Sequence, residues 1–267
     1  MTGVNTLLGK AEGIHDHPYL KLGVKPRPFG TKTCKLSDYL DTASLPNPPA
    51  SIDWQSGAMD AIQMFRNDQI GDCGIAGLFH VIETCAKNAG LPLSFTDDEA
   101  VELYSTFGGY NPADPSTDGG VVLVDLLKYM VRTGFKGRNV TAFADVNFRN
   151  PKELKIATFL FGNLYWGFNL PEAAQNMSNV WDKPSAFNLG SPQAGSWGGH
   201  CVSSASYAAD NSHIVTSWGK RIQVTQYFIE NYAMECHVLL VPEWIAKSGL
   251  SPSGFNFAAL KSDISVI

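Results

Sequence analysis

The chain has 267 residues, of which 44% are hydrophobic and 17% are charged, and its formal net charge is −5. This composition predicts a globular protein that can bury a core. No run of lysine and arginine stands out and no apolar stretch reaches membrane-spanning length, so nucleic acid and membranes are not expected partners. The opening MTGVNTLLGKAEG lacks the long apolar core of a signal peptide, which favours a cytoplasmic protein.

The cysteines form no recognisable metal or disulfide pattern. They stand at positions 34, 73, 85, 201 and 236, and no CxxC pair occurs. Zinc sites and disulfide frameworks normally show close and regular spacing. We therefore expect neither a bound metal nor another cofactor.

The N-terminal part of the chain is rich in proline, glycine and lysine up to the sequence SLPNPPA (44–50). This composition predicts an extended arm over residues 1–47 rather than a packed domain. The arm is a candidate contact for a partner in a protein assembly. Residues 48–267 are then expected to form the folded domain, with residues 246–267 as its C-terminal tail.

Three helices are predicted next. The first begins at Cys73 and closes near Gly90, with apolar residues at helical spacing. A second begins at TDDE (96–99), which has the form of a capping box, and a third follows the sequence DGG (118–120).

The pattern then changes from helical to strand-like. A short helix is expected at Pro151, strands at 164–170, 200–209, 213–218 and 235–241, and a further helix in VTQYFIENYA (224–233). Helices followed by strands predict an α+β fold of two lobes, a helical one over about 60–150 and a β one over about 151–245. A cleft between such lobes is a common place for a functional site.

Two residues from different lobes suggest nucleophilic catalysis. Cys73 stands at a predicted helix N-terminus, where unpaired N–H groups and the helix dipole stabilise a thiolate. His200 opens the first long strand of the β lobe after two glycines. An imidazole that faces such a cysteine can take the thiol proton and keep the sulfur reactive.

The order and context of these residues resemble the papain family of cysteine peptidases over roughly residues 48–245. PPASIDWQSGAM resembles the family's mature start, GDC the nucleophile segment that ends in Cys73, and SWGGHCV the segment around His200. STDGG, with Gly119 and Gly120, resembles the turn that pairs with substrate backbone, and IVTSWG, with Trp218, falls where the family has its SWG motif. The resemblance implies a papain-like α+β fold, peptidase activity and a peptide or protein substrate.

The departures from the family pattern concern the residues around this pair. Asn67 stands where the family has its oxyanion-hole glutamine, with Gln69 as the second choice for that role. Thr216 stands where an asparagine orients the catalytic histidine, and the nearby Asp210 or Asn211 are alternatives. The cysteines of a usual papain disulfide are replaced by Ile70 and Thr117, which suits a reducing compartment.

The sequence therefore predicts acyl transfer from a peptide or amide bond to Cys73, with His200 as base, Asn67 and Thr216 in supporting roles, and Gly119, Gly120 and Trp218 along the substrate. Amide transfer or isopeptide cleavage is an alternative within the same chemistry. The alternative from another class is a non-enzymatic binding or structural protein on a papain-like scaffold, such as a phage virion component, because folds are reused without their chemistry.

Overall fold

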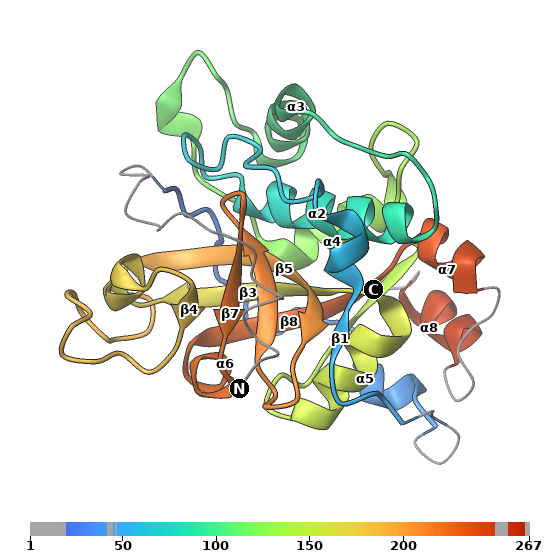
Figure 1. The fold of residues 1–267 in the computed structure, drawn as a ribbon. Coiled ribbons are helices and arrows are strands. Elements are labelled where there is room, and N and C mark those ends of the chain that lie inside the picture. Colours follow the sequence, from blue (N-terminus) through green and yellow to red (C-terminus); the bar gives the residue numbers. More distant parts are fainter. Residues whose placement is uncertain (1–19, 42–44, 46, 249–255, 265–267) are drawn as a thin grey trace.

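The structure is a computed structural model that describes residues 20–41, 45, 47–248 and 256–264. Its helices are α2 (Cys73–Asn88), α3 (Asp97–Gly108), α4 (Leu123–Arg132), α5 (Pro151–Phe161), α6 (Gln226–Tyr232), α7 (Pro242–Ser248) and α8 (Phe257–Ile264). Its strands are β1 (Ile52–Asp53), β2 (Ala142–Asp145), β3 (Leu164–Leu170), β4 (Val180–Trp181), β5 (Gly198–Tyr207), β6 (His213–Ser217), β7 (Lys220–Val224) and β8 (Ala233–Leu240). Figure 1 shows α2, α3 and α4 grouped above the strands. The predicted α+β class, with helices first and a sheet afterwards, is confirmed.

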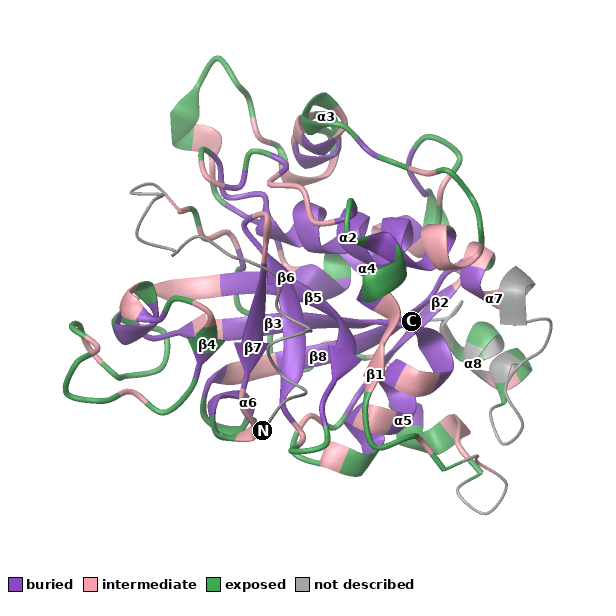
Figure 2. Ribbon diagram, in the orientation of Figure 1, coloured by how far each residue is buried: buried purple, intermediate pink, exposed green. Residues whose placement is uncertain are grey.

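The strands form one eight-stranded sheet in the order β2-β8-β3-β5-β6-β7-β4, and β1 adds to β5. The pairs are antiparallel except for β4 and β7, which run parallel. The central strands β3 and β5 are almost wholly buried, as Figure 2 shows. The strand β5, which carries His200, therefore lies in the middle of the sheet, where its backbone is held on both sides.

Helix α2 is the main element of the helical part that contacts the sheet. Its residues from Cys73 to Ala86 are all buried, which is typical of a helix in the centre of a core. Glycine allows the close approach, because a Cβ atom at Gly77 would lie 2.9 Å from the sulfur of Cys201 on β5. The N-terminus of α2 is thereby held directly against β5.

Most predicted elements are present, and the differences have physical causes. Thr96 and Glu99 form the expected capping box at the start of α3, and the strand expected at 164–170 is β3. Sequence analysis missed β1, β2, β4 and β7. Strand β7 carries a charged Arg221, which is buried because its guanidinium lies 2.9 Å from the Asp53 carboxylate. Strand β2 lies in the region that was expected to be helical, and its burial shows no alternation.

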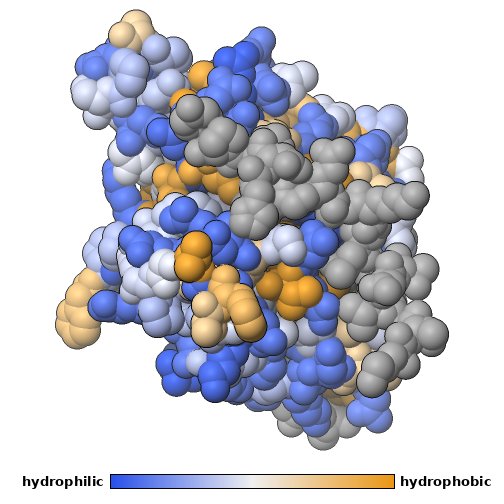
Figure 3. Space-filling view, turned by 60° about the vertical axis from the view of Figure 1, so that its left-hand side comes forward, coloured by the Kyte–Doolittle hydropathy of each residue, from blue (hydrophilic) through white to orange (hydrophobic). Residues whose placement is uncertain are grey.

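The surface carries few large apolar patches on the face drawn in Figure 3, where hydrophobic side chains lie in small groups among hydrophilic ones. Among the helices that the structure describes, none is long and apolar enough to cross a membrane. All five cysteines are free thiols and are buried.

Candidate active site

Cys73 is the first residue of α2, and its side chain is only 1% exposed. The backbone N–H of Cys201 points to the Cys73 sulfur with an N–S distance of 3.4 Å. Because Cys201 directly follows His200 in β5, the Cys73 sulfur lies beside the backbone of the strand that carries His200. They meet where the N-terminus of α2 contacts the middle of the sheet.

The imidazole of His200 is held by two neighbours. Its Nε2 lies 2.7 Å from the hydroxyl oxygen of Ser217, and its ring stacks on Trp218 with 4.0 Å between ring centroids. Its Nδ1 is buried and has no hydrogen bond within the described part of the chain, so no thiol–imidazole hydrogen bond is formed in this state. When Nε2 carries the proton and donates it to Ser217, Nδ1 is left as a proton acceptor.

A tight turn places Trp218 over the histidine. Ser217 and Lys220 face each other in the β6–β7 hairpin, and the two residues between them, Trp218 and Gly219, have φ angles of 47° and 69°. Two positive φ angles are typical of a type I′ hairpin turn, which matches the twist of the strands. A bulky side chain rarely adopts this conformation, so the ring that covers His200 is held at some cost in backbone strain.

In this state the two groups are both neutral. Burial raises the pKa of the Cys73 thiol to about 12, although backbone N–H groups that include those of Cys201 and Gly23 favour the anion. Burial lowers the pKa of His200 to about 3. The sequence predicted a thiolate stabilised by the helix N-terminus, but desolvation outweighs the helix dipole while water is excluded.

Thr216 does not make the contact that was expected of it. The hydroxyl that bonds His200 belongs to Ser217, and successive residues of a strand point to opposite faces. Thr216 is buried and pairs with Ser203 and Arg221 in the sheet. The alternative Asp210 is engaged in its own turn, where its carboxylate accepts the Ser212 N–H at 3.0 Å.

Asn67 lies in the turn before α2 and is also buried. Its side-chain Nδ2 donates to the carbonyl of Ile70 at 3.1 Å. This bond ties the turn together ahead of Cys73, and it uses one of the two amide hydrogens. Gln69, the second choice for an oxyanion donor, is exposed.

An extended part of the chain itself lies across the two residues. This covering segment, residues Leu20 to Lys25, is dark blue in Figure 1 and runs between the helical part and the sheet. It bonds to both sides: Lys21 N to Asn67 O (3.0 Å), Gly23 N and Val24 N to Gly199 O (3.2 and 3.0 Å), Lys25 N to Val121 O (2.8 Å), Val121 N to Gly23 O (2.7 Å), and Trp218 Nε1 to Lys21 O (3.3 Å). The cleft between the two parts therefore binds an extended backbone, and the covering segment excludes water from the sulfur.

Glycines make room for this backbone on both walls. A Cβ atom at Gly120 would lie 2.2 Å from the carbonyl oxygen of Gly23, and one at Gly199 would lie 2.3 Å from that of Val24. Gly119 lies beside the Lys25 side chain. The turn that was expected to pair with a peptide backbone does pair with one, through the backbone of the next residue, Val121.

Comparison with known proteins gives a fold but no close relative. No family model and no curated protein matches the chain. The solved structure of xylellain, a cysteine protease from Xylella fastidiosa, superimposes with a TM-score of 0.63 at 14% identity and covers 83% of this chain and 96% of its own. The chain has the papain-like fold. A recombinant stem bromelain precursor (TM-score 0.54, 13% identity, 85% of each chain) and digestive procathepsin L 3 from Tenebrio molitor larval midgut (0.54, 12%, 88% of this chain and 83% of that one) share it.

Sequence analysis missed two parts of this papain-like cleft. Ser217 belongs to the SWG motif that resembles the papain family. The sequence analysis instead expected the preceding residue, Thr216, to orient His200. The covering segment gave no signal beyond its extended composition, because its interactions are made by backbone atoms and depend on glycines distant in the sequence.

Proposed function

We propose that the protein is a papain-like cysteine peptidase or amidase, with Cys73 as nucleophile and His200 as general base. The observation that carries the proposal is the position of the covering segment. An extended backbone already lies in the cleft, where the N–H groups of Gly23 and Val24 donate to the Gly199 carbonyl. A peptide substrate that replaces it would lie against the same backbone groups of Gly199 and Val121.

In the proposed reaction, His200 Nδ1 takes the thiol proton and the sulfur attacks the substrate carbonyl carbon. The tetrahedral intermediate collapses when the amine leaves with that proton, and a thioester to Cys73 remains. Water, deprotonated by the same nitrogen, then hydrolyses the thioester and regenerates the thiol. Ser217 keeps the proton on Nε2 and so leaves Nδ1 as the base. The N–H groups at the helix N-terminus are candidates for stabilising the oxyanion, and Asn67 would contribute only if its amide turned from Ile70.

The covering segment has to leave before this reaction can begin. With the segment in place the thiol is neutral and out of contact with water, and no substrate carbonyl can reach it. When the segment leaves, water reaches the site. Burial then no longer raises the pKa of Cys73 or lowers that of His200. The helix dipole and the imidazolium then favour the thiolate.

The test is hydrolysis of an unfolded protein by a chain whose cleft has been opened. A Cβ atom at Gly23 would lie 1.7 Å from the carbonyl oxygen of Gly71, so Gly23→Ala cannot keep the segment in its place. We expect this variant to produce discrete fragments, and the double variant Gly23→Ala, Cys73→Ala to produce none. Lys21→Ala is a matched control, because it changes an exposed side chain of the same segment and keeps the backbone bonds.

The non-enzymatic alternative has one observation in its favour, which is that the pair is neutral and covered. It predicts that neither variant cleaves any substrate and that Cys73 reacts no faster than a simple thiol when the cleft is open.

For the location of the protein, five free thiols and the absence of the usual cysteine pair at Ile70 and Thr117 favour a reducing compartment such as the cytoplasm.

A further inference from the structure

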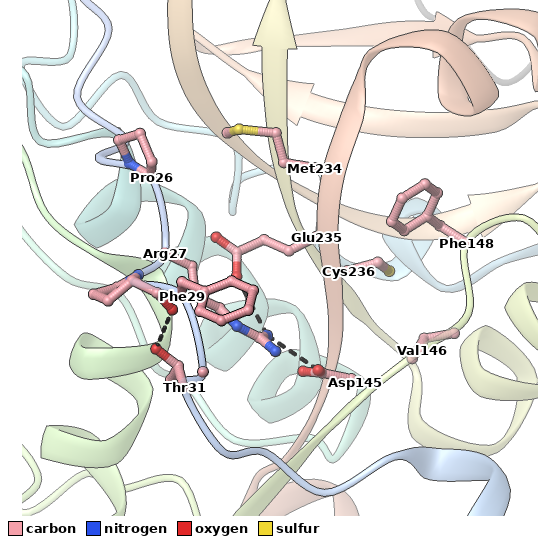
Figure 4. Close-up of a pocket in the computed structure, with 12 residues that line it drawn as sticks. Pro26, Arg27, Phe29, Thr31, Asp145, Val146, Phe148, Met234, Glu235 and Cys236 are labelled. Atoms are coloured by element: carbon pink, nitrogen blue, oxygen red, sulfur yellow. Dashed lines mark hydrogen bonds and ion pairs between the residues drawn. The ribbon is translucent and has the colours of Figure 1, made fainter.

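A second group of charged side chains lies where the chain leaves the covering segment. Arg27 extends its guanidinium to the carboxylate of Asp145, at an Nη1–Oδ2 distance of 3.0 Å, and reaches within 4.0 Å of Glu235 Oε2. Its other terminal nitrogen donates to the Thr33 hydroxyl at 3.2 Å. Figure 4 shows Arg27, Asp145 and Glu235 converging, with Phe29 and Phe148 nearby. These residues line a cavity of about 500 Å³.

The two carboxylates also hold a buried histidine. His237 is fully buried, with Nδ1 at 2.8 Å from Asp145 and Nε2 at 3.0 Å from Glu235. Burial disfavours its charged form, but the two neighbouring carboxylates outweigh that effect and raise the pKa of His237 to about 9. Burial raises the pKa of Asp145. Its partners His237, Thr33 and Arg27 outweigh that effect and lower the pKa to about 2.

The charges of this group balance only when a guanidinium is present. Asp145 and Glu235 contribute two negative charges and His237 one positive charge, so Arg27 neutralises the remaining negative charge. Glu235 is only 8% exposed. A partly buried carboxylate without a counter-charge is costly, so whatever displaces Arg27 is favoured if it brings a cation.

The cavity adjoins the cleft that contains Cys73. Glu235 pairs with Gly167 of β3, and Gly167 pairs with Cys201 of β5. Since neighbouring strands are about 4.8 Å apart, Glu235 lies roughly 10 Å from the backbone beside His200. Arg27 lies two residues beyond the covering segment and three residues after Val24, and three extended residues span about the same length.

We propose that this cavity binds an arginine side chain of the peptide substrate, and that Arg27 pairs with its carboxylates in the covered state. The inference rests on the proposed function for its substrate, although the site itself can be tested without activity. Asp145 and Glu235 supply the carboxylates, Thr33 a hydroxyl, and the apolar walls pack against the side-chain stem. Arginine is favoured over lysine because its planar fork can bond the carboxylate and the hydroxyl at once, as Arg27 does.

The first experiment empties the site in the full chain by Arg27→Ala and adds N-acetyl-arginine amide or its neutral analogue N-acetyl-citrulline amide. We expect the arginine compound to raise the thermal midpoint of Arg27→Ala and to bind about tenfold or more tightly than the citrulline compound, as a charge-assisted bond requires. The wild-type chain should show no shift, because Arg27 already pairs with Asp145. If Arg27→Ala does not fold, Arg27→Gln keeps most of the side-chain stem and serves instead.

Matched variants identify the carboxylate that binds. Adding Glu235→Gln to Arg27→Ala should abolish the preference for arginine, whereas adding Glu230→Gln, the same change at an exposed position of α6, should not. Equal shifts with both compounds, or no shift with either, would overturn the inference.

A second experiment separates this inference from the proposed function. In the Gly23→Ala, Arg27→Ala chain, two peptidyl fluoromethyl ketones that differ only in arginine or citrulline are compared for labelling of Cys73. Faster labelling by the arginine probe supports the subsite. Equal rates overturn it while the reactive thiol stands. Failure of Cys73 to react even with iodoacetamide overturns the proposed function, and the thermal-shift result still decides the arginine site.

Discussion

Substitution of Gly23 by alanine should expose the Cys73 thiol without unfolding the protein. The new methyl group would lie 1.7 Å from the carbonyl oxygen of Gly71, 2.4 Å from its carbonyl carbon and 2.9 Å from its Cα. All three are backbone atoms of the turn that precedes α2, so they cannot turn aside as a side chain could. The covering segment has to move instead.

The size of the effect follows from the contacts that hold the segment. Its hydrogen bonds contribute about 1 kcal/mol each in net terms, and ordering each of its residues costs roughly 1–2 kcal/mol of conformational entropy. These contributions are of similar size, so they nearly cancel. Overpacking typically costs about 1–3 kcal/mol. While the open state is a minor population, a loss of about 2 kcal/mol raises the open fraction roughly thirtyfold.

The assay is the rate of iodoacetamide labelling at neutral pH, followed by mass spectrometry of the peptide that contains Cys73. If labelling proceeds through the open state, its rate follows the open fraction and should rise by about the same factor, roughly thirtyfold. The other four thiols are buried and serve as internal controls. The reasoning is refuted if Cys73 reacts at the wild-type rate, or if Cys85 and Cys236 become reactive to the same extent, since that would indicate general unfolding.

Three further predictions concern the site and the core. In the opened chain, Ser217→Ala should lower the Cys73 labelling rate at pH 6 by about tenfold, because the hydroxyl that orients His200 is lost. Thr216→Val should change that rate by less than about twofold. A larger effect of Thr216→Val than of Ser217→Ala would make Thr216 the orienting residue. Burial lowers the pKa of His80 to about 4 and those of His200 and His213 to about 3, so the contribution of these histidines to the free energy of unfolding should fall as the pH drops from about 6.5 towards 4. Burial raises the pKa of Glu83 to about 7 and that of Asp72 as well, and these carboxyl groups contribute in the opposite direction. Urea midpoints of the wild-type chain and of His80→Gln, which can still donate to the Gln63 carbonyl, isolate one histidine: the variant should lose less stability than the wild type between pH 6.5 and 4, and equal pH dependence contradicts the assignment. The thermal midpoint should be the same with and without dithiothreitol, and a clear drop in reductant would show that cysteines pair in the native protein.

The class of fold and the two central site residues could be predicted from the sequence, because both depend on local patterns. Periodicity predicts α2 and β3, the capping box predicts the start of α3, and the GDC and GGH segments are short enough to be read directly. The contact between Ser217 and His200 was not predictable in the same way. Alternation along β6 decides which of two adjacent hydroxyls faces the ring, and that depends on the register of β5 against β6.

The protonation state of the site was beyond sequence reasoning for a different reason. A helix N-terminus and an imidazole both predict a thiolate, and the covering segment reverses that outcome by excluding water. The segment binds through its backbone to Gly199 and Val121, far away in the sequence. Backbone recognition of this kind leaves no side-chain pattern for sequence analysis to detect.

The glycines of the cleft have a consequence for how the protein moves. Gly23 lies in contact with Gly71 and Gly120 on one wall, while it and the next residue bond to Gly199 on the other. Because the fit is this close on both sides, the segment cannot lift at one residue and keep its neighbours seated. Its amides should therefore exchange with solvent deuterium as one cooperative unit, at a rate distinct from that of the sheet beneath. Access to the thiol then depends on how often that unit opens.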